Sequence, residues 1–566
     1  MIIGIDLGTT YSAVATVGAD GYPTALANSI GDLTTPSVVY FESASSVLVG
    51  VAARSAAVPD PDNGVELIKR QMGTEARPQF HGATHTPESV SSLILRSLVA
   101  DTLQAAARDE PVRAVVTVPA HFGIREREAT LQAARLAGIE VLELLAEPVA
   151  AALHYITSPR SGYDHTRGGA TLVYDLGGGT FDTTVLTVGP DGLRVVATDG
   201  DSRLGGADWD ERITAYLLEN FVRAADDADA YDDEQFLRYV DDVAEQAKRA
   251  LSTTTARDVV LRRGSVSTTV PFDRSVLARL GADLVDRTTT IARRVSVAAA
   301  LRVDEVILVG GASRMPAVAE AITTELGIRP RLVEPDLAVV YGAAIRAHQL
   351  VSRPSLAVAG GLMSAIADKP TTSVVPRSFG VLLADSHDPS GTREVVAHTV
   401  HQNQPLPAST TTPFCTIVDG QDRVRIQVYE QAGDLPSEEV AHNRRVLDGE
   451  LTNLPPLRAG SRIDVTLRVS QDGLLSVTAR EPRSGATLTL EAYVDGVVDE
   501  AVTRQLEGEL RGLTIRQRGG HELLGTTLVR RHRFDAGATW PAPGRTAGTA
   551  RRHGPAVHRR ERLDEW

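Results

Sequence analysis

Residues 171–184 read TLVYDLGGGTFDTT, and this stretch predicts a β-hairpin with a glycine tip. An apolar run ends at Leu176, three glycines follow, and β-branched residues resume at Thr183. In this register Asp175 and Asp182 face each other, and two carboxylates so close favour a nearby cation. Glycines have no Cβ, so their N–H groups can approach a phosphate. Taken alone, the three glycines would favour a tight surface turn with two solvated aspartates.

The N-terminus repeats this pattern. Residues 2–10 read IIGIDLGTT, where Asp6 opens the tripeptide DLG as Asp175 does in the later stretch. Internal similarity of this kind predicts two related lobes, each with a phosphate-binding hairpin. The residue that would face Asp6 is Ala13, so this hairpin supplies one carboxylate where the other supplies two. Two such hairpins facing one another predict a cleft for a nucleotide and a divalent metal ion.

Composition limits the class of protein. A chain of 566 residues predicts two or more domains, and its 42% hydrophobic content is ordinary for a soluble protein. The single cysteine, Cys415, excludes an intrachain disulfide and suits a reducing compartment, so we expect a cytoplasmic protein. The start of the chain has no basic region typical of a signal peptide, and we expect no membrane span. The net charge of −14 argues against general nucleic-acid binding.

The basic residues are almost all arginine. Among 58 lysines and arginines, only Lys69, Lys248 and Lys369 are lysines. A lysine in such a chain indicates a site that needs a compact ammonium group rather than a planar guanidinium. For any single lysine, chance remains the alternative.

The first 350 residues alternate between strands and helices, which indicates α/β layers. Glu147 follows a strand and opens a helix, a common place for a catalytic side chain, although an acidic residue there also stabilises a helix N-terminus. The acidic run 226–233 is expected to be solvated. The main predicted strands are 112–118, 139–145 and 306–309, and the main predicted helices are 125–137, 147–152, 205–212, 245–252 and 337–348.

Beyond residue 375 the pattern becomes that of a β-sandwich, with a hairpin turn at Asp472. A helix over residues 495–513 would place Val498, Val502, Leu506 and Leu510 on one face. The last stretch, 516–566, holds 11 arginines against 5 acidic residues and predicts a disordered tail. Contact of this tail with nucleic acid or acidic partners is the alternative. The predicted sandwich strands are 376–381, 424–428, 463–469, 475–479 and 488–494.

Four motifs in order resemble the heat-shock protein 70 chaperone family of the bacterial DnaK type. They are IIGIDLGTTYSAVA, TVPAHFGIREREATLQAARLAGIEVLELLAEPVAAAL, VYDLGGGTFD and ILVGGASRMPAV. The resemblance implies a multidomain α/β and β protein, in which an actin-like (ribonuclease H-like) two-lobed ATPase domain precedes a β-sandwich that binds substrate. The expected boundaries are 1–350 for the ATPase domain, 351–375 for a linker, 376–494 for the sandwich, 495–515 for a short helix and 516–566 for the tail.

Carried over by position, the resemblance also implies an ATP or ADP site with Mg²⁺. Asp6 and Asp175 would hold the metal largely through its waters. Lys69 would position the attacking water, helped by the side chains of Glu147, Thr180 and Asp182. The implied phosphate cradle is Gly8, Thr9, Thr10, Tyr11, Gly178, Gly179 and Thr180. The implied contacts to the nucleoside are Glu245, Lys248, Arg249, Ser252, Gly310, Gly311, Ala312, Ser313, Arg314 and Asp336.

Two of the three lysines fall on these implied contacts, which makes chance a poor account of them. Pro119, Arg127 and Glu147 match the relay by which the family couples its nucleotide to the sandwich. The linker departs from the family, because residues 365–375 read AIADKPTTSVV and lack its acidic, leucine-rich pattern. The long helical lid is also missing, since only one short helix can follow the sandwich.

The sequence therefore predicts an ATP-hydrolysing molecular chaperone that binds extended apolar segments of unfolded client polypeptides. The resemblance also implies a J-domain co-chaperone and a nucleotide exchange factor as partners, with neither nucleic acid nor membrane. The alternative is an ATP-binding scaffold with one fixed partner and weak coupling between its domains. A small-molecule kinase has less support, because no catalytic base is evident beyond the ATP cluster.

Overall fold

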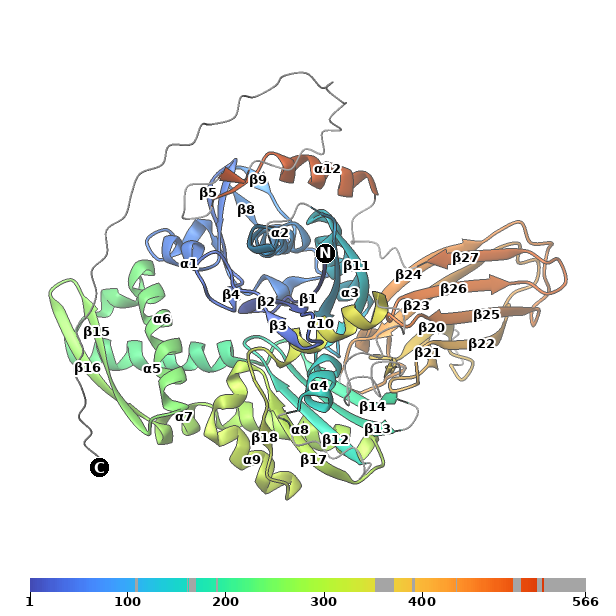
Figure 1. Ribbon diagram of the computed structural model, residues 1–566. Helices are drawn as coiled ribbons and strands as arrows, with labels where there is room; N and C mark the ends of the chain where they lie inside the picture. Colours follow the sequence, from blue (N-terminus) through green and yellow to red (C-terminus); the bar gives the residue numbers. More distant parts are fainter. Residues whose placement is uncertain are drawn as a thin grey trace, which may run out of the picture. The chain divides into compact units, whose positions relative to one another are not determined.

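The computed structural model describes residues 1–106, 110–159, 161, 169–189, 192–351, 371–388, 392–433, 435–491, 500–516 and 522–523 (Figure 1). The chain divides into two units, residues 1–525 and 526–566, and every described residue belongs to the first. Most of the tail predicted to be disordered, and residues 352–370 of the predicted linker, lie outside the described residues.

The first sheet is built around the N-terminal hairpin. Strands β1 and β2 are antiparallel, and Asp6 faces Ala13 as predicted. Strand β10 lies parallel to β1, β11 lies parallel to β10, and the order is β11-β10-β1-β2-β3. The strands are β1 (Ile2–Asp6), β2 (Tyr11–Val17), β3 (Pro23–Ala25), β4 (Thr35–Pro36, paired with β2), β10 (Val112–Val118) and β11 (Ile139–Ala146).

The second sheet repeats this order around the second hairpin. Strands β12 and β13 are antiparallel, and Asp175 faces Asp182 as predicted. The order is β18-β17-β12-β13-β14-β19, with β17 parallel to β12 and β18 parallel to β17. The repeated DLG tripeptide is thus accompanied by a repeated strand topology. The strands are β12 (Ala170–Leu176), β13 (Phe181–Gly189), β14 (Gly192–Asp201), β17 (Val303–Val309), β18 (Arg331–Leu332) and β19 (Thr371–Thr372).

Two helices, α4 (Glu147–Thr157) and α10 (Ala338–Val351), pack against each other between the sheets. Their approach requires glycine, because a Cβ at Gly342 would lie 1.7 Å from the carbonyl oxygen of Ala150. The first sheet is covered by α2 (Pro87–Ala106) and α3 (Ile124–Leu136), and the second by α8 (Ala282–Ala298) and α9 (Pro316–Leu326). The paired helices bring the ends of the two hairpins to one place.

Smaller elements accompany each of the two sheets without joining it. On the first side lie α1 (Val51–Ala57), β5 (Val39–Ser43), β6 (Ser46–Val49), β7 (Gly64–Val65), β8 (Gln79–Phe80), β9 (Ala83–Thr84) and the 3-10 helices η1 (Pro61–Asn63) and η2 (Ile68–Gln71). On the second lie α5 (Gly206–Ala225), η3 (Ala228–Tyr231), α6 (Glu234–Leu251), β15 (Ala256–Arg263), β16 (Val266–Asp273), α7 (Arg274–Leu280) and η4 (Gly311–Arg314). The acidic run 226–233 is mostly exposed, as expected.

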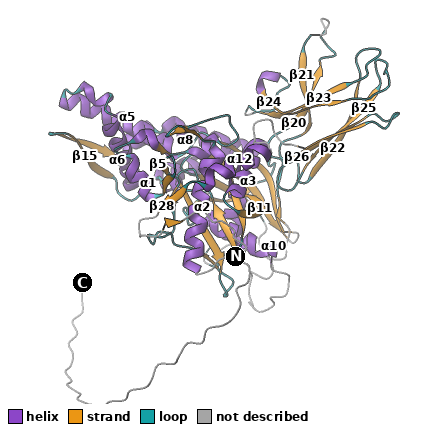
Figure 2. Ribbon diagram, turned by 90° about the horizontal axis from the view of Figure 1, so that it is seen from above, coloured by secondary structure: helices purple, strands orange, loops and turns teal. Residues whose placement is uncertain are grey.

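The later strands form two four-stranded antiparallel sheets with the orders β21-β20-β23-β24 and β22-β25-β26-β27 (Figure 2). Their inward-facing apolar residues make one core, as the alternating pattern predicts. Gly473, in the turn predicted between β25 and β26, has a φ of 79°. The strands are β20 (Phe379–Ala384), β21 (Glu394–Val400), β22 (Ala408–Cys415), β23 (Val424–Gln431), β24 (Asn443–Leu451), β25 (Arg462–Val469), β26 (Leu475–Arg480) and β27 (Thr487–Glu491), with η5 (Val440–His442) before β24.

The C-terminal segment corrects two expectations. The predicted helix ends earlier, because α12 spans Glu500–Arg511 and a strand, β28 (Thr514–Arg516), follows. The predicted disorder is wrong at Arg516, Glu522 and Leu523, because β28 and β29 (Glu522–Leu523) pair with each other. Strand β28 also pairs with β6, a partner far away in the sequence. Within the described part of the chain, no helix combines the length and apolar character required to span a membrane.

Candidate phosphate and nucleotide site

The tips of the two hairpins lie against each other. A Cβ at Gly178 would lie 2.0 Å from Oγ1 of Thr10, and one at Gly179 would lie 2.2 Å from Cγ2 of Thr9. No side chain fits at either glycine, so the backbone of each tip lies close to the other hairpin. The residues predicted as a phosphate cradle are therefore brought together.

A buried cluster of charges lies behind the tips. The Lys69 ammonium, on η2, is 2.6 Å from Oε1 of Glu147, the first residue of α4. Asp6, at the end of β1, accepts a hydrogen bond of 2.8 Å from the Thr117 hydroxyl. Asp175 is 5% exposed. The ends of β1 and β12, the start of α4 and the 3-10 helix η2 thus place four predicted site residues in one cluster.

Burial dominates the electrostatics of this cluster. It raises the pKa of Glu147 to about 7, although the neighbouring Lys69 ammonium opposes the shift. The pKa of Asp175 is raised well above its usual value, first by burial and then by repulsion from Glu147, Asp182 and Asp6. The pKa of Asp6 is also raised by burial, against the influence of Lys69 and Thr117. Excess negative charge held out of water favours a cation in the cluster.

These donors fit Mg²⁺ in the water-mediated manner expected from the sequence. Mg²⁺ prefers oxygen ligands and keeps several of its waters. Asp6 and Asp175 supply carboxylate oxygens, and the excess negative charge favours the metal. Among the described residues, no three His, Cys, Asp or Glu side chains are close enough to hold an ion on their own. Water or phosphate oxygens would complete the coordination.

Asp182 has a partner that the sequence did not reveal. Its Oδ1 accepts hydrogen bonds from the backbone N–H of His121 at 3.1 Å and from the His121 ring nitrogen Nδ1 at 2.8 Å. Both side chains are buried. The only available signal was the position of His121, which follows β10 in the segment TVPAHF. Its two hydrogen bonds fix the orientation of Asp182.

Tyr11 connects the two halves of the site. Its hydroxyl accepts hydrogen bonds from Arg54 at 3.0 Å and from Arg249 at 3.1 Å, and donates to Glu245 at 3.3 Å. Arg54 also pairs with Glu245 at 3.2 Å, and both arginines lie over the Tyr11 ring. Two residues predicted to contact the nucleoside therefore touch a residue predicted to belong to the phosphate cradle. Arg54 itself was not predicted.

The other predicted nucleoside contacts lie on α5, α6 and η4. The Lys248 ammonium is 2.7 Å from the Gly206 carbonyl and 2.5 Å from Asp210, whose pKa burial raises to about 6. Arg314 pairs with Asp336. A Cβ at Gly206 would touch Ala312, so the start of α5 lies against η4.

The remaining predicted contacts are held by the backbone. Gly310 has a φ of 81°, and a Cβ there would lie 2.3 Å from the Leu176 carbonyl oxygen. Gly311 begins η4, and the Ser313 hydroxyl donates to the Val309 carbonyl at 2.6 Å. Ser252 ends α6 as its C-cap, and no described side-chain contact fixes its role.

Arg70 is a second site residue that sequence reasoning missed. Its Nε donates to the Gly179 carbonyl at 2.9 Å, and its guanidinium pairs with Asp208 at 2.6 Å. Arg70 follows Lys69 on η2, in the first half of the chain. Its partner Asp208 lies on α5, in the second half. Arg70 thus holds the second glycine tip from the first half of the chain.

The predicted relay residues lead from this site toward the sandwich. Pro119 begins the turn after β10, and its carbonyl accepts from the N–H of Phe122 at 3.1 Å. Arg127 is buried, and it donates to the carbonyls of Phe122 at 3.0 Å and Asp472 at 3.2 Å. Burial lowers the pKa of Arg127.

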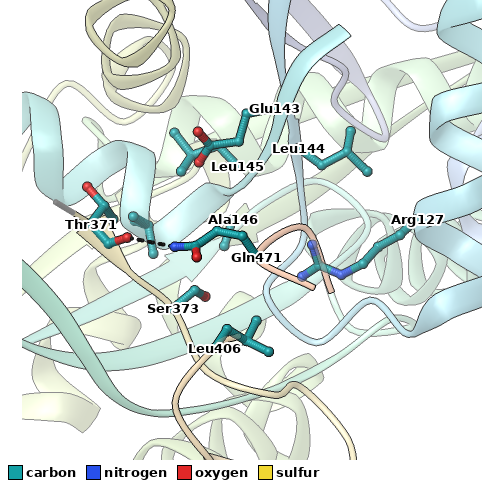
Figure 3. Close-up of a pocket in the computed structure, with 10 residues that line it drawn as sticks. Arg127, Glu143, Leu144, Leu145, Ala146, Thr371, Ser373, Leu406 and Gln471 are labelled. Atoms are coloured by element: carbon teal, nitrogen blue, oxygen red, sulfur yellow. Dashed lines mark hydrogen bonds between the residues drawn. The ribbon is translucent and has the colours of Figure 1, made fainter. Parts of the chain in front are cut away.

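A cavity of about 20 Å³ lies beside Arg127, which is room for one water molecule. Gln471, in the turn after β25, donates to the Thr371 carbonyl at 3.2 Å beside this cavity (Figure 3). Leu406 and Ser373 line its other side. The end of the predicted linker thus contacts both the second sheet, through β19, and the sandwich.

Two related hairpins meet at glycine tips, with a lysine and several carboxylates buried behind them, and this arrangement is suited to binding phosphate. The comparison with family models gives the particular family. The chain belongs to the Hsp70 family, because the model described as Hsp70 protein matches its residues 2–79 and 74–508. Members of this family are nucleotide-binding ATPases that act as chaperones, usually with Mg²⁺, and they generally bind unfolded polypeptides and co-chaperones.

Proposed function

We propose that this protein hydrolyses Mg-ATP and uses the reaction to bind and release extended apolar segments of unfolded polypeptides. The observation that carries the proposal is the Lys69–Glu147 pair, buried next to Asp6, Asp175 and Asp182. A buried ammonium among carboxylates is expensive unless it serves a charged ligand or reaction. The location we propose is the cytoplasm, in agreement with the single exposed cysteine.

In this proposal each charged residue has a distinct task. Bound Mg²⁺ would neutralise phosphate charge, and Asp6 and Asp175 would hold it largely through its water ligands. Lys69 orients the attacking water and offsets charge on the γ-phosphate. Glu147 holds the Lys69 ammonium in place at 2.6 Å. Asp182, fixed by His121, accepts a hydrogen bond from the water, and Thr180 supplies a hydroxyl at the same tip. Phosphoryl transfer needs mainly such positioning and charge neutralisation.

The sandwich is the proposed site for polypeptides. Ile417 and Val418, which follow β22, are 70% and 55% exposed. Among the described strands, β22 lies at the edge of its sheet and pairs with β25. An edge strand beside exposed apolar side chains suits capture of an extended chain by backbone pairing and apolar contact. J-domain co-chaperones and nucleotide exchange factors would act as partners, as in the rest of the family.

The second candidate is an ATP-binding scaffold with one fixed partner. The packing of α12 favours it, because this helix contacts α3 and its leucines join the core of the first sheet. A chain whose last described helix does not cover the sandwich would hold clients weakly and couple its domains weakly. We expect ATP to loosen peptide by less than tenfold, or about 1.4 kcal/mol.

A peptide array probed with ADP and with ATP distinguishes the two candidates. A chaperone binds many apolar peptides and releases them with ATP. A scaffold binds one sequence or none, whichever nucleotide is present. Peptide affinity measured by fluorescence anisotropy on a Lys69→Ala variant then gives the size of the coupling. A change of a hundredfold or more would contradict weak coupling.

A further inference from the structure

The C-terminal segment 500–516, which we call the latch, comprises α12 and β28. Four apolar side chains of the latch are buried, with exposures of 5% for Leu506, 3% for Leu510, 4% for Leu513 and 3% for Ile515. They belong to the same apolar core as the first sheet, α2, β5 and β6. Figures 1 and 2 both place α12 beside α3. The latch is thus packed as an internal part of the N-terminal region, residues 1–351.

Backbone pairing joins the latch to the same region. Strand β28 lies parallel to β6, with Thr514 opposite Ser46 and Ile515 opposite Val47. The five-stranded sheet has the order β29-β28-β6-β5-β7, so without β28 the edge of β6 would be open. An open edge leaves a row of N–H and C=O groups without partners. The latch completes this sheet.

A half-buried arginine binds the end of the latch helix. Nη1 of Arg96, on α2, donates to the Leu510 carbonyl at 2.9 Å. Carbonyls in the last turn of a helix have no partner within the helix, so this hydrogen bond caps α12 from outside. Arg516 pairs with Glu42, on β5, at 3.2 Å. Apolar burial, strand pairing and a helix cap therefore act together.

The sandwich contacts the N-terminal region in a different way. Most of its hydrogen bonds and ion pairs are like those of Arg444 with Glu126 at 3.0 Å and Arg377 with the His121 carbonyl at 3.1 Å, and one apolar side chain of α3, Ile124, is buried in the sandwich core. Such contacts exchange readily for contacts with water, whereas four buried apolar side chains do not. Separation of the sandwich from the N-terminal region would therefore precede release of the latch.

We propose that the latch stays bound to the groove formed by α2, α3 and β6 in every nucleotide state, and so tethers the C-terminal end of the sandwich to the N-terminal region. Eight residues separate Glu491 of β27 from Glu500 of α12. A chain of that length spans about 30 Å at most. The other end of the sandwich follows β19, which pairs with β14. Two short connections then limit how far the sandwich can move.

A disulfide between the latch and β6 tests the proposal. Ser46→Cys and Thr514→Cys, combined with Cys415→Ser, place two thiols on neighbouring strands at a separation that suits a disulfide. We expect the disulfide to form at the same rate, within twofold, with no nucleotide, with ADP and with ATP. Fluorescent ATP confirms that the site is loaded. Formation at least tenfold slower in any of these states overturns the proposal. The readout requires neither hydrolysis nor client binding, so it is independent of the proposed function.

The disulfide also tests the tether in function. Locking the latch should leave any ATP-dependent change in sandwich position unchanged, as measured by energy transfer between dyes on β15 and β26. Loss of that change on oxidation would show that the latch must leave. As a second measurement, Leu506→Asp with Leu510→Asp should speed hydrogen exchange in β5 and β6 by at least tenfold, while Arg511→Asp, at an 80% exposed side chain, should not. Equal exchange in both variants would show that the latch is not part of that core.

Discussion

The two glycine hairpins share their strand order and differ at one facing position. Asp6 faces Ala13 in the first hairpin, whereas Asp175 faces Asp182 in the second. The same strand arrangement therefore occurs twice, but only the second hairpin has two carboxylates that face each other. The ammonium that offsets them, Lys69, and its partner Glu147 both come from the half of the chain that holds the first hairpin. The comparison indicates that the first half supplies the ammonium and its carboxylate partner, and the second half supplies the facing pair of carboxylates.

The largest effect is expected at the ammonium buried among the carboxylates. Lys69→Ala should lower single-turnover hydrolysis by about 10²–10³-fold and leave ATP affinity near that of the native protein, because one transition-state donor is lost. Lys69→Arg should restore little, since a planar guanidinium cannot replace a compact ammonium beside Glu147. Rapid-quench kinetics with radiolabelled ATP measures both variants. Native-like hydrolysis in Lys69→Ala would remove this residue from the mechanism.

Making the hairpins alike should destabilise the fold. Ala13 is 3% exposed, so Ala13→Asp would bury a second carboxylate opposite Asp6 and cost about 3 kcal/mol of unfolding free energy. Asp182→Asn makes the opposite change and should stabilise the metal-free protein by up to about 1 kcal/mol, because repulsion with Asp175 is relieved. Urea unfolding in EDTA measures both. A destabilised Asp182→Asn would show that its contacts with His121 outweigh the repulsion.

Mg²⁺-dependent ATP binding should depend more on the second hairpin, through Asp175, than on the first, through Asp6. Asp175→Asn should weaken ATP binding in Mg²⁺ by about tenfold, which is about 1.4 kcal/mol, and Asp6→Asn by less. The reason is that more negative charge surrounds Asp175 than Asp6. Calorimetric titration with Mg²⁺ and with EDTA gives both values. Equal ATP affinity in Mg²⁺ and EDTA for the native protein would contradict the proposed role of the carboxylate cluster.

The fourth effect is a dependence of stability on pH. Burial raises the pKa of Glu147 from 4.5 in the unfolded chain to about 7 in the folded protein. The folded state then holds the extra proton between these values, so the unfolding free energy falls as pH rises from about 4.5 to about 7. Asp175 and Asp6 shift in the same direction. Melting curves without Mg²⁺ should show this fall, and Glu147→Gln should flatten it. An unchanged slope in Glu147→Gln would assign the effect to the aspartates.

The hairpins were predictable because their evidence is local. Strand, glycine tip and facing aspartates all lie within fourteen residues, 171–184, and the N-terminal copy repeats the strand and its DLG tripeptide. The contacts between the halves were not predictable in this way. Arg54 meets Glu245, and His121 meets Asp182, across long stretches of chain that no local period connects. Only the folded chain brings such residues together.

The latch is a second case in which the sequence did not reveal a contact between distant residues. Its apolar face at Leu506 and Leu510 was evident from helical spacing, and the structure buries both residues. The spacing predicts that this helix face is buried but does not identify the surface that covers it. The groove formed by α2, α3 and β6 could therefore not be predicted. For the same reason the arginine-rich composition concealed β28, whose ordering depends on a partner strand near the other end of the chain.

The scarcity of lysine has a practical consequence for chemical modification. The side chains of Lys69 and Lys248 are only 4% and 10% exposed, and both pair with carboxylates. Lys369 lies outside the described residues. Across the described surface, therefore, reagents and enzymes that acylate ε-amino groups find almost no accessible target. Arginine provides the positive charge of the surface instead. The ε-amino groups of Lys69 and Lys248 would react only when the site opens.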